Sequence, residues 1–237
     1  DLIVSPEHDN IKGDNVITTT GAIHYLTRKE IKENSNYLGL EEKKKKLVAF
    51  IIGGPNKYYA YTEQVIHQTF NKVKTLFTPD KYKIIVIPSY RTPKDVIKKA
   101  YDTFNFNHHV VKEVDKKAYL SALAISDHII VTCDSTSMIS EAAVTGKPVY
   151  IAMMKSIQNN YRFKKFYNKF EKQKIVHISR DYIDILKSKL IGKVTHFLDS
   201  NNIENKRLID NTILDKQEEY KKILESSIIS NQQINFQ

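Results

Sequence analysis

The sequence has a single cysteine, no tryptophan and no long apolar run. Cys133 alone cannot form an intramolecular disulfide, and such sparse cysteine is typical of a reducing compartment. The longest apolar runs, such as 47–52 and 129–131, are far shorter than the roughly 20 residues that a membrane-spanning helix needs. No secretory signal is visible. We therefore expect a soluble, cytoplasmic protein, with the inner face of the membrane as a further expected location.

Catalytic signatures with a fixed local pattern are also missing. The chain contains no GxSxG, Walker loop, HExxH or CxxC sequence. These absences argue against a serine hydrolase and a P-loop enzyme.

The formal net charge of +10, from 37 Lys and Arg against 27 Asp and Glu, raises the question of a nucleic-acid or anionic-membrane partner. The lysines are scattered, and their one dense run, 43–46, follows two glutamates and precedes a strand, as in a solvated linker. No RNP-like, helix-turn-helix or zinc pattern accompanies the charge. We expect no nucleic-acid partner, while peripheral contact with an anionic membrane stays an expectation.

From residue 47 onward, short apolar runs rich in β-branched residues alternate with helical periods. This alternation predicts an α/β fold with a Rossmann-like, doubly wound parallel sheet covered by helices on both faces. Strands are predicted at 47–52, 83–88, 108–114, 128–132, 148–153 and 174–178. Helices are predicted from Thr62, from Thr92 to about Tyr101, and over 116–125, 135–144, 161–170 and 181–190.

The two ends of the chain follow a different pattern. Residues 1–40 contain two short strands, 1–4 and 16–20, and a helix from Thr27, which is too little for a separate core. We expect three parts: 1–40 as the remnant of an N-terminal domain with an interdomain crossover, 41–200 as the Rossmann-like domain, and 201–237 as a helix with a frayed tail. Because Asp1 opens directly into a strand, a fragment or a processed chain is also expected.

Polar residues follow three of the predicted strands, at the edge where open parallel sheets bind ligands. Gly53 and Gly54 let the backbone approach a ligand, although an ordinary tight turn explains them as well. Ser89 and Arg91 could hold a phosphate, with an ordinary surface arginine as the alternative.

The third strand end, Asp134 to Ser137, precedes a helix. Ser135, Thr136 and Ser137 leave backbone N–H groups that can bind an anion at the helix start, but a plain N-cap by Asp134 or Ser135 is an equal alternative. Glu141, one turn further on, could accept both hydroxyls of a ribose or be a solvated helix charge.

Other candidate residues carry weaker signals. Glu7-His8-Asp9 has metal-ligand residue types, yet adjacent residues seldom chelate one ion, so no metal site is predicted. His8 and His24 are the weak candidates for a catalytic base. Cys133, at the end of a buried strand, is most simply a small core residue.

Several segments together resemble the mitochondrial-fission ELM (elongated mitochondria) family and its bacterial relatives. The resemblance covers about residues 1–170 and rests on four segments: PEHDNIKGDNVITTTGAIH, FIIGGPNKYYAYT, VIPSYRTP and YLSALAISDHIIVTCDSTSMISEAAVTGKPVYI. That family resembles GT-B glycosyltransferases, which have two Rossmann-like domains and hold the donor nucleotide in the second. The resemblance implies that this chain forms the C-terminal half of a GT-B-type fold.

The resemblance also implies roles for the residues at the strand ends. Gly53, Gly54, Ser89 and Arg91 would face a diphosphate, Ser135 to Ser137 would bind it at the helix start, and Glu141 would hold the ribose. No cofactor and no metal would be needed, and the ligand would be a nucleoside-diphosphate sugar. The sequence does not specify the nucleobase and sugar of the donor, the acceptor, the catalytic base or the oligomeric state.

Two functional classes follow from the resemblance. The first is a glycosyltransferase acting on an acceptor such as an envelope glycoconjugate. The second is a non-catalytic interaction module of the mitochondrial-fission type with a vestigial nucleotide site, or a degraded gene fragment.

Overall fold

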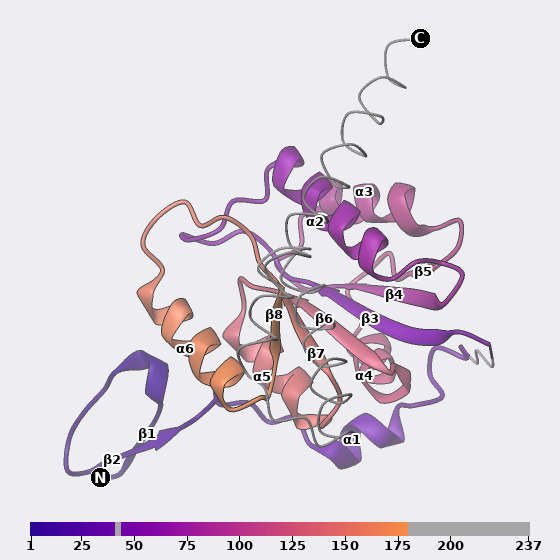
Figure 1. Ribbon diagram of the computed structural model, residues 1–237. Coiled ribbons are helices and arrows are strands. Elements are labelled where there is room, and N and C mark those ends of the chain that lie inside the picture. Colours follow the sequence, from indigo (N-terminus) through magenta and orange to yellow (C-terminus); the bar gives the residue numbers. More distant parts are fainter. Residues whose placement is uncertain (41–43, 180–237) are drawn as a thin grey trace, which may run out of the picture. The chain divides into compact units, whose positions relative to one another are not determined.

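In the computed structural model, residues 1–40 and 44–179 are described. Within them lies a six-stranded parallel sheet in the order β5-β4-β3-β6-β7-β8 (Figure 1). The strands are β3 (Lys46–Ile52), β4 (Tyr82–Pro88), β5 (His109–Val110), β6 (His128–Thr132), β7 (Val149–Ala152) and β8 (His177–Ser179). The chain runs outward from β3 to β5 and then returns to the other side of β3, which is the Rossmann strand order. The expected fold class is confirmed as far as an α/β fold with a Rossmann-like, doubly wound parallel sheet.

Helices cover both faces of this sheet. The helices α2 (Glu63–Leu76) and α3 (Lys94–Phe104) pack on one face, and α4 (Lys116–Ile125), α5 (Thr136–Val144) and α6 (Tyr161–Lys172) pack on the other (Figure 1). Alternate residues of β3 divide between two cores, with Phe50 on the α2 and α3 side and Ile51 on the α4 to α6 side. The near-continuous apolar strands are therefore explained by burial on both faces.

Local sequence sets where the helices begin. The Thr62 hydroxyl accepts a hydrogen bond from the Val65 N–H and starts α2, and the Asp115 carboxylate accepts from two backbone N–H groups and starts α4. Pro93 precedes α3, whose last residue, Phe104, lies beyond the predicted end at Tyr101. Fully buried Cys133 is a core residue as expected, and burial raises the pKa of its thiol to about 12.

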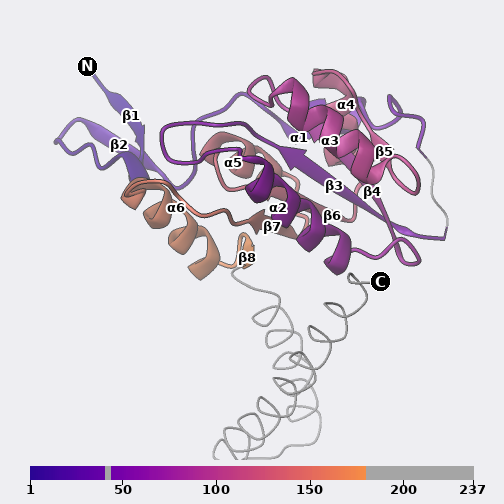
Figure 2. The ribbon, with the colours of Figure 1, turned by 90° about the horizontal axis from the view of Figure 1, so that it is seen from above.

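The N-terminal segment forms a separate pair of parallel strands, β1 (Ile3–Pro6) and β2 (Val16–Thr19), with the short 3-10 helix η1 (Glu7–Asp9) between them. Its last element, α1 (Arg28–Glu33), packs on α4. The η1 segment is fixed to α6 by ion pairs from Asp9 to Arg162 and from Glu7 to Lys169. Figure 2 shows the β1 and β2 segment beside α6. The segment thus has no core of its own, as the sequence predicts.

Two expectations concern regions that the description does not reach. The helix at 181–190 and the third expected part, 201–237 with its boundary at residue 200, lie outside the described residues. No helix in the described ranges is both long and apolar enough to cross a bilayer.

Candidate functional site

The polar residues predicted to form a site lie at the point where the strand order of the sheet reverses, between β3 and β6. The loops after β3, β4 and β6 all leave the carboxyl ends of neighbouring parallel strands. Between β3 and β6 the successive crossovers turn to opposite sides, and this is where open α/β sheets bind ligands.

Asp134 is the centre of the polar contacts at this edge. Its side chain is 0% exposed. It accepts hydrogen bonds from the Gly54 N–H at 3.0 Å, from Arg91 Nη2 at 2.8 Å and from the Tyr61 hydroxyl at 2.6 Å. A buried carboxylate is tolerated when it is paired and hydrogen-bonded in this way. We call Tyr61, Arg91, Thr132 and Asp134, with the backbone of Gly53 and Gly54, the Asp134 network.

Tyr61 acts as a permanent donor within the Asp134 network. Burial, followed by the negative charge of Asp134, raises the pKa of Tyr61 far above its usual range. Tyr61 therefore keeps its hydroxyl proton and donates a hydrogen bond to Asp134. The Tyr61 hydroxyl also lies 3.1 Å from that of Thr132, which accepts a hydrogen bond from the Gly53 N–H at 2.8 Å.

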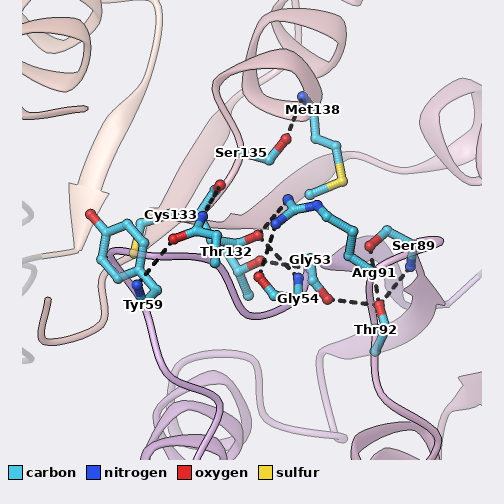
Figure 3. Close-up of polar contacts among 12 residues, drawn as sticks. Gly53, Gly54, Tyr59, Ser89, Arg91, Thr92, Thr132, Cys133, Ser135 and Met138 are labelled. Carbon is cyan, nitrogen blue, oxygen red and sulfur yellow. Dashed lines mark hydrogen bonds and ion pairs between the residues drawn. The ribbon is translucent and has the colours of Figure 1, made fainter. Parts of the chain in front are cut away.

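The two glycines are needed because protein groups fill the space beside them. A Cβ at Gly53 would overlap the Asp134 carboxylate, and a Cβ at Gly54 would overlap the Arg91 carbonyl. Both glycines are buried. Their lack of a side chain lets three loops pack against one another, and that close packing is visible in Figure 3.

Arg91 ties the β4 loop to the other two loops (Figure 3). Besides its ion pair with Asp134, it donates from Nη1 to the Gly54 carbonyl at 3.0 Å. Its side chain remains 41% exposed. Ser89 is half-buried, and its hydroxyl lies 3.2 Å from that of Thr92, a buried residue whose hydroxyl also contacts the Ile52 and Gly53 carbonyls.

The start of α5 resolves the two N-cap alternatives. The Ser135 hydroxyl oxygen accepts a hydrogen bond from the Met138 N–H at 3.3 Å, so Ser135 is the N-cap (Figure 3). Asp134 does not cap the helix, because its oxygens are used by the Asp134 network. Capping uses the Ser135 oxygen as acceptor and leaves its proton free to donate. Thr136 and Ser137 occupy the first turn of α5.

A cavity of about 440 Å³ opens beside these loops. Four of the predicted site residues line it: Ser89, Arg91, Ser135 and Glu141. The lining does not include Gly53, Gly54, Thr136 or Ser137. The cavity also has an apolar part, lined by residues that include Leu26, Val114, Leu120 and Met138.

Glu141 has a protein partner inside this cavity. Its Oε2 accepts a hydrogen bond of 2.7 Å from the hydroxyl of Tyr119, which lies on α4 and also lines the cavity. The neighbouring Lys116 forms its ion pair with Glu30, at 2.8 Å. Glu141 is thus held by a neutral donor and is not the close ion-pair partner of that lysine.

The two candidate bases lie apart from this cavity. His8 is buried against α6, where its ring makes an edge contact with Phe166 at 5.0 Å between centroids, and burial lowers its pKa. His24 lines a second cavity of about 540 Å³, formed by residues 19–24 with α5 and α6 residues. Neither histidine is among the residues that line the first cavity.

Sequence reasoning missed three residues that shape the site. The hydroxyl groups of Tyr61, Thr92 and Tyr119 contact Asp134, Ser89 and Glu141, respectively. The SYRTP and DKKAYL segments contain Thr92 and Tyr119, but a single hydroxyl residue gives no local signal of its partner.

Comparison with known proteins identifies relatives of the chain. Residues 1–194 match the family described as Mitochondrial fission ELM1. The chain is 30% identical over 192 residues to "Uncharacterized protein RP120" of Rickettsia prowazekii, covering 77% of this chain and 52% of that protein. It is 32% identical over 146 residues to "Mitochondrial fission protein ELM1" of Arabidopsis thaliana, covering 58% of this chain and 33% of that protein. The chain therefore spans about half or less of the length of these relatives.

Solved structures show more distant likeness. A UDP-GlcNAc 2-epimerase from Neisseria meningitidis, bound to UDP-GlcNAc, has 16% identity and a TM-score of 0.46, covering 88% of this chain and 57% of that one. The E. coli ADP-heptose lps heptosyltransferase II has 12% identity and a TM-score of 0.36, covering 54% and 38%.

Proposed function

The chain belongs to the mitochondrial fission ELM1 family, and we propose that the cavity at the carboxyl edge of its sheet binds the nucleoside diphosphate of a nucleotide sugar. The observation that carries this proposal is the composition of the cavity wall. Ser89, Arg91 and Ser135 provide polar donors to this wall, and Leu26, Val114, Leu120 and Met138 provide apolar surface. A phosphate group needs the first kind of surface and a nucleobase the second.

The start of α5 supports the phosphate end of the site. The backbone N–H groups of the first helical turn carry partial positive charge, and anions bind at such positions. Ser135 and the partly exposed Arg91 side chain add donors to the cavity wall. The volume of about 440 Å³ lies within the range of small-molecule sites, which is roughly 300–1,000 Å³.

In the complete protein, this site would serve a metal-independent glycosyltransferase. The bond between the anomeric carbon and the diphosphate oxygen would break as the oxygen of an acceptor hydroxyl forms its bond to that carbon, and the hydroxyl proton would pass to the catalytic base. The start of α5 and Arg91 would stabilise the negative charge of the departing diphosphate. The acceptor and the catalytic base are not assigned to residues of this chain, since His8 and His24 lie apart from the cavity.

A second candidate function is an interaction module with a vestigial nucleotide site. Two observations favour it. Arg91 already has an anionic partner in Asp134, and the N-terminal segment exposes apolar side chains, including Leu2, Ile3, Val4 and Ile17. A module of this kind would bind a protein through that surface and would not respond to nucleotides.

A thermal-shift screen of the chain with UDP, GDP, CMP and their sugar conjugates tests the first function. At a ligand concentration 100-fold above Kd, binding adds about 2.7 kcal/mol and should raise the Tm by about 5 °C or more. We expect one nucleotide to do this, and we expect Glu141→Ala and Ser135→Ala to abolish the shift.

Two matched variants control for general destabilisation. Glu63→Ala removes an exposed glutamate from α2, and Thr62→Ala removes the N-cap of the same helix, both away from the cavity. These two variants should keep the nucleotide-induced shift. Absence of a shift with every nucleotide would contradict the proposed function and favour the interaction module.

A further inference from the structure

Tyr119 and Glu141 form a hydrogen-bonded pair in the wall of the cavity. The two residues come from neighbouring helices, α4 and α5, and both side chains line the cavity. The Tyr119 hydroxyl donates to Glu141 Oε2 across 2.7 Å, a distance typical of a hydrogen bond to a charged acceptor.

The direction of this hydrogen bond is fixed. Burial, followed by the charge and the hydrogen bond of Glu141, raises the pKa of Tyr119 well above its usual range. Tyr119 therefore keeps its single hydroxyl proton and donates a hydrogen bond to the Glu141 carboxylate, which is the acceptor.

The pair leaves part of the carboxylate free to accept further hydrogen bonds. An ionised carboxylate offers about four acceptor positions on its two oxygens, and Tyr119 occupies one of them. Within the described residues, no other hydrogen bond to Glu141 is found. The remaining positions suit two donors side by side, such as the adjacent hydroxyls of a ribose. A phosphate oxygen would instead be repelled by the carboxylate charge.

We propose that Tyr119 is a positioning residue that holds Glu141 in the orientation needed to accept the two ribose hydroxyls, so that the cavity selects ribonucleotides over 2′-deoxyribonucleotides. This inference rests on the proposed function, because it needs a nucleotide in the cavity. It adds a specificity that depends on a residue outside the predicted site.

The test compares the affinity of the chain for UDP, GDP, ADP and CDP with that for the 2′-deoxy form of each, by isothermal titration calorimetry. For the nucleotide that binds, we expect the 2′-deoxy form to bind about tenfold more weakly, since a charged hydrogen bond is lost. In Tyr119→Phe this preference should fall to about threefold or less, because Glu141 is no longer held.

A Tyr150→Phe variant serves as the control, since it removes a half-buried tyrosine hydroxyl in β7 that does not line the cavity. It should keep the wild-type preference. A merely structural role of Tyr119 would lower both affinities equally and leave their ratio unchanged. Should Tyr119→Phe fail to fold, Glu141→Gln provides the second variant, and the same loss of preference is expected.

The outcomes separate this inference from the function on which it rests. If no nucleotide binds the wild-type chain, the proposed function itself fails, and the inference fails with it. Equal binding of ribo and 2′-deoxy forms by the wild type would leave the proposed function standing and overturn the inference. An unchanged preference in Tyr119→Phe would overturn it as well.

Discussion

The carboxyl edge of the sheet carries two groups of polar residues that use their hydrogen bonds in opposite ways. In the Asp134 network, one buried carboxylate receives three donors from two loops, those after β3 and β4, and its oxygens face protein groups. In the cavity, Tyr119 is the one donor to Glu141 among the described residues, and the Ser135 hydroxyl accepts a hydrogen bond from the Met138 N–H. The network is closed, whereas the cavity still has unused donors and acceptors.

This difference shows that polar residues at one edge of a sheet can be hydrogen-bonded within the protein or keep hydrogen-bonding capacity on a cavity wall. The Asp134 network positions the loops, and Arg91 belongs to both groups because its guanidinium contacts Asp134 and still lines the cavity. Closed groups should therefore determine stability, and open groups should determine binding.

The largest expected effect on stability comes from replacing the Asp134 carboxylate by a neutral amide of equal size. Asp134→Asn replaces a buried acceptor of three hydrogen bonds and leaves the Arg91 charge without its partner, so we expect a loss of about 3 kcal/mol in the free energy of unfolding. Glu141→Gln, the same exchange in the cavity, should cost less than about 1 kcal/mol. Urea denaturation of both variants measures the difference.

For nucleotide affinity we expect the opposite order of the two variants. Glu141→Gln should weaken nucleotide affinity more than Asp134→Asn does, while its fold stays intact. Similar stability losses in the two variants would mean that the closed and open groups do not differ as described.

Adding one methyl group tests how tightly the network is packed. Gly53→Ala forces a Cβ into the Asp134 carboxylate, and we expect it to cost about 2–3 kcal/mol. Gly39→Ala is the matched substitution, since Gly39 has a φ of 58° and no neighbour within 4 Å of an added Cβ. That variant should cost about 1 kcal/mol, from backbone strain alone. The comparison of Tm values decides the matter: a Gly53→Ala variant as stable as Gly39→Ala would exclude close packing.

The sheet could be predicted from the sequence because each strand carries its own signal. The apolar stretches at β3, β4 and β6 are buried on both faces, and their lengths match the predicted ranges to within a residue. The strand β5 spans only His109–Val110, shorter than the predicted 108–114, because pairing with β4 stops after two residues. The burial of a strand can be predicted from its own residues. The number of residues that pair with the neighbouring strand depends on that neighbour as well.

The site could be predicted only in outline. Ser89, Arg91, Ser135 and Glu141 were placed at the same edge by the rule that parallel strands end together, and they line one cavity. The closed network was not predicted, because Gly53, Arg91 and Asp134 are distant in sequence and nothing in their spacing reveals a shared carboxylate. Such contacts depend on the strand order, which the sequence alone leaves open.

Ser135 offers the smallest effect on stability and the sharpest separation of the two roles, since it caps α5 and lines the cavity. Aspartate is as good an N-cap as serine, so Ser135→Asp should change the free energy of unfolding by no more than about 0.5 kcal/mol. In the cavity, however, the new carboxylate would repel a diphosphate. Affinity for a nucleoside diphosphate should therefore fall by about tenfold or more, while affinity for the uncharged nucleoside changes little. The matched Thr62→Asp variant at the start of α2 should leave both affinities unchanged. Equal losses for nucleoside and nucleoside diphosphate in Ser135→Asp would place the phosphates away from α5, because only a charge near them can distinguish the two ligands.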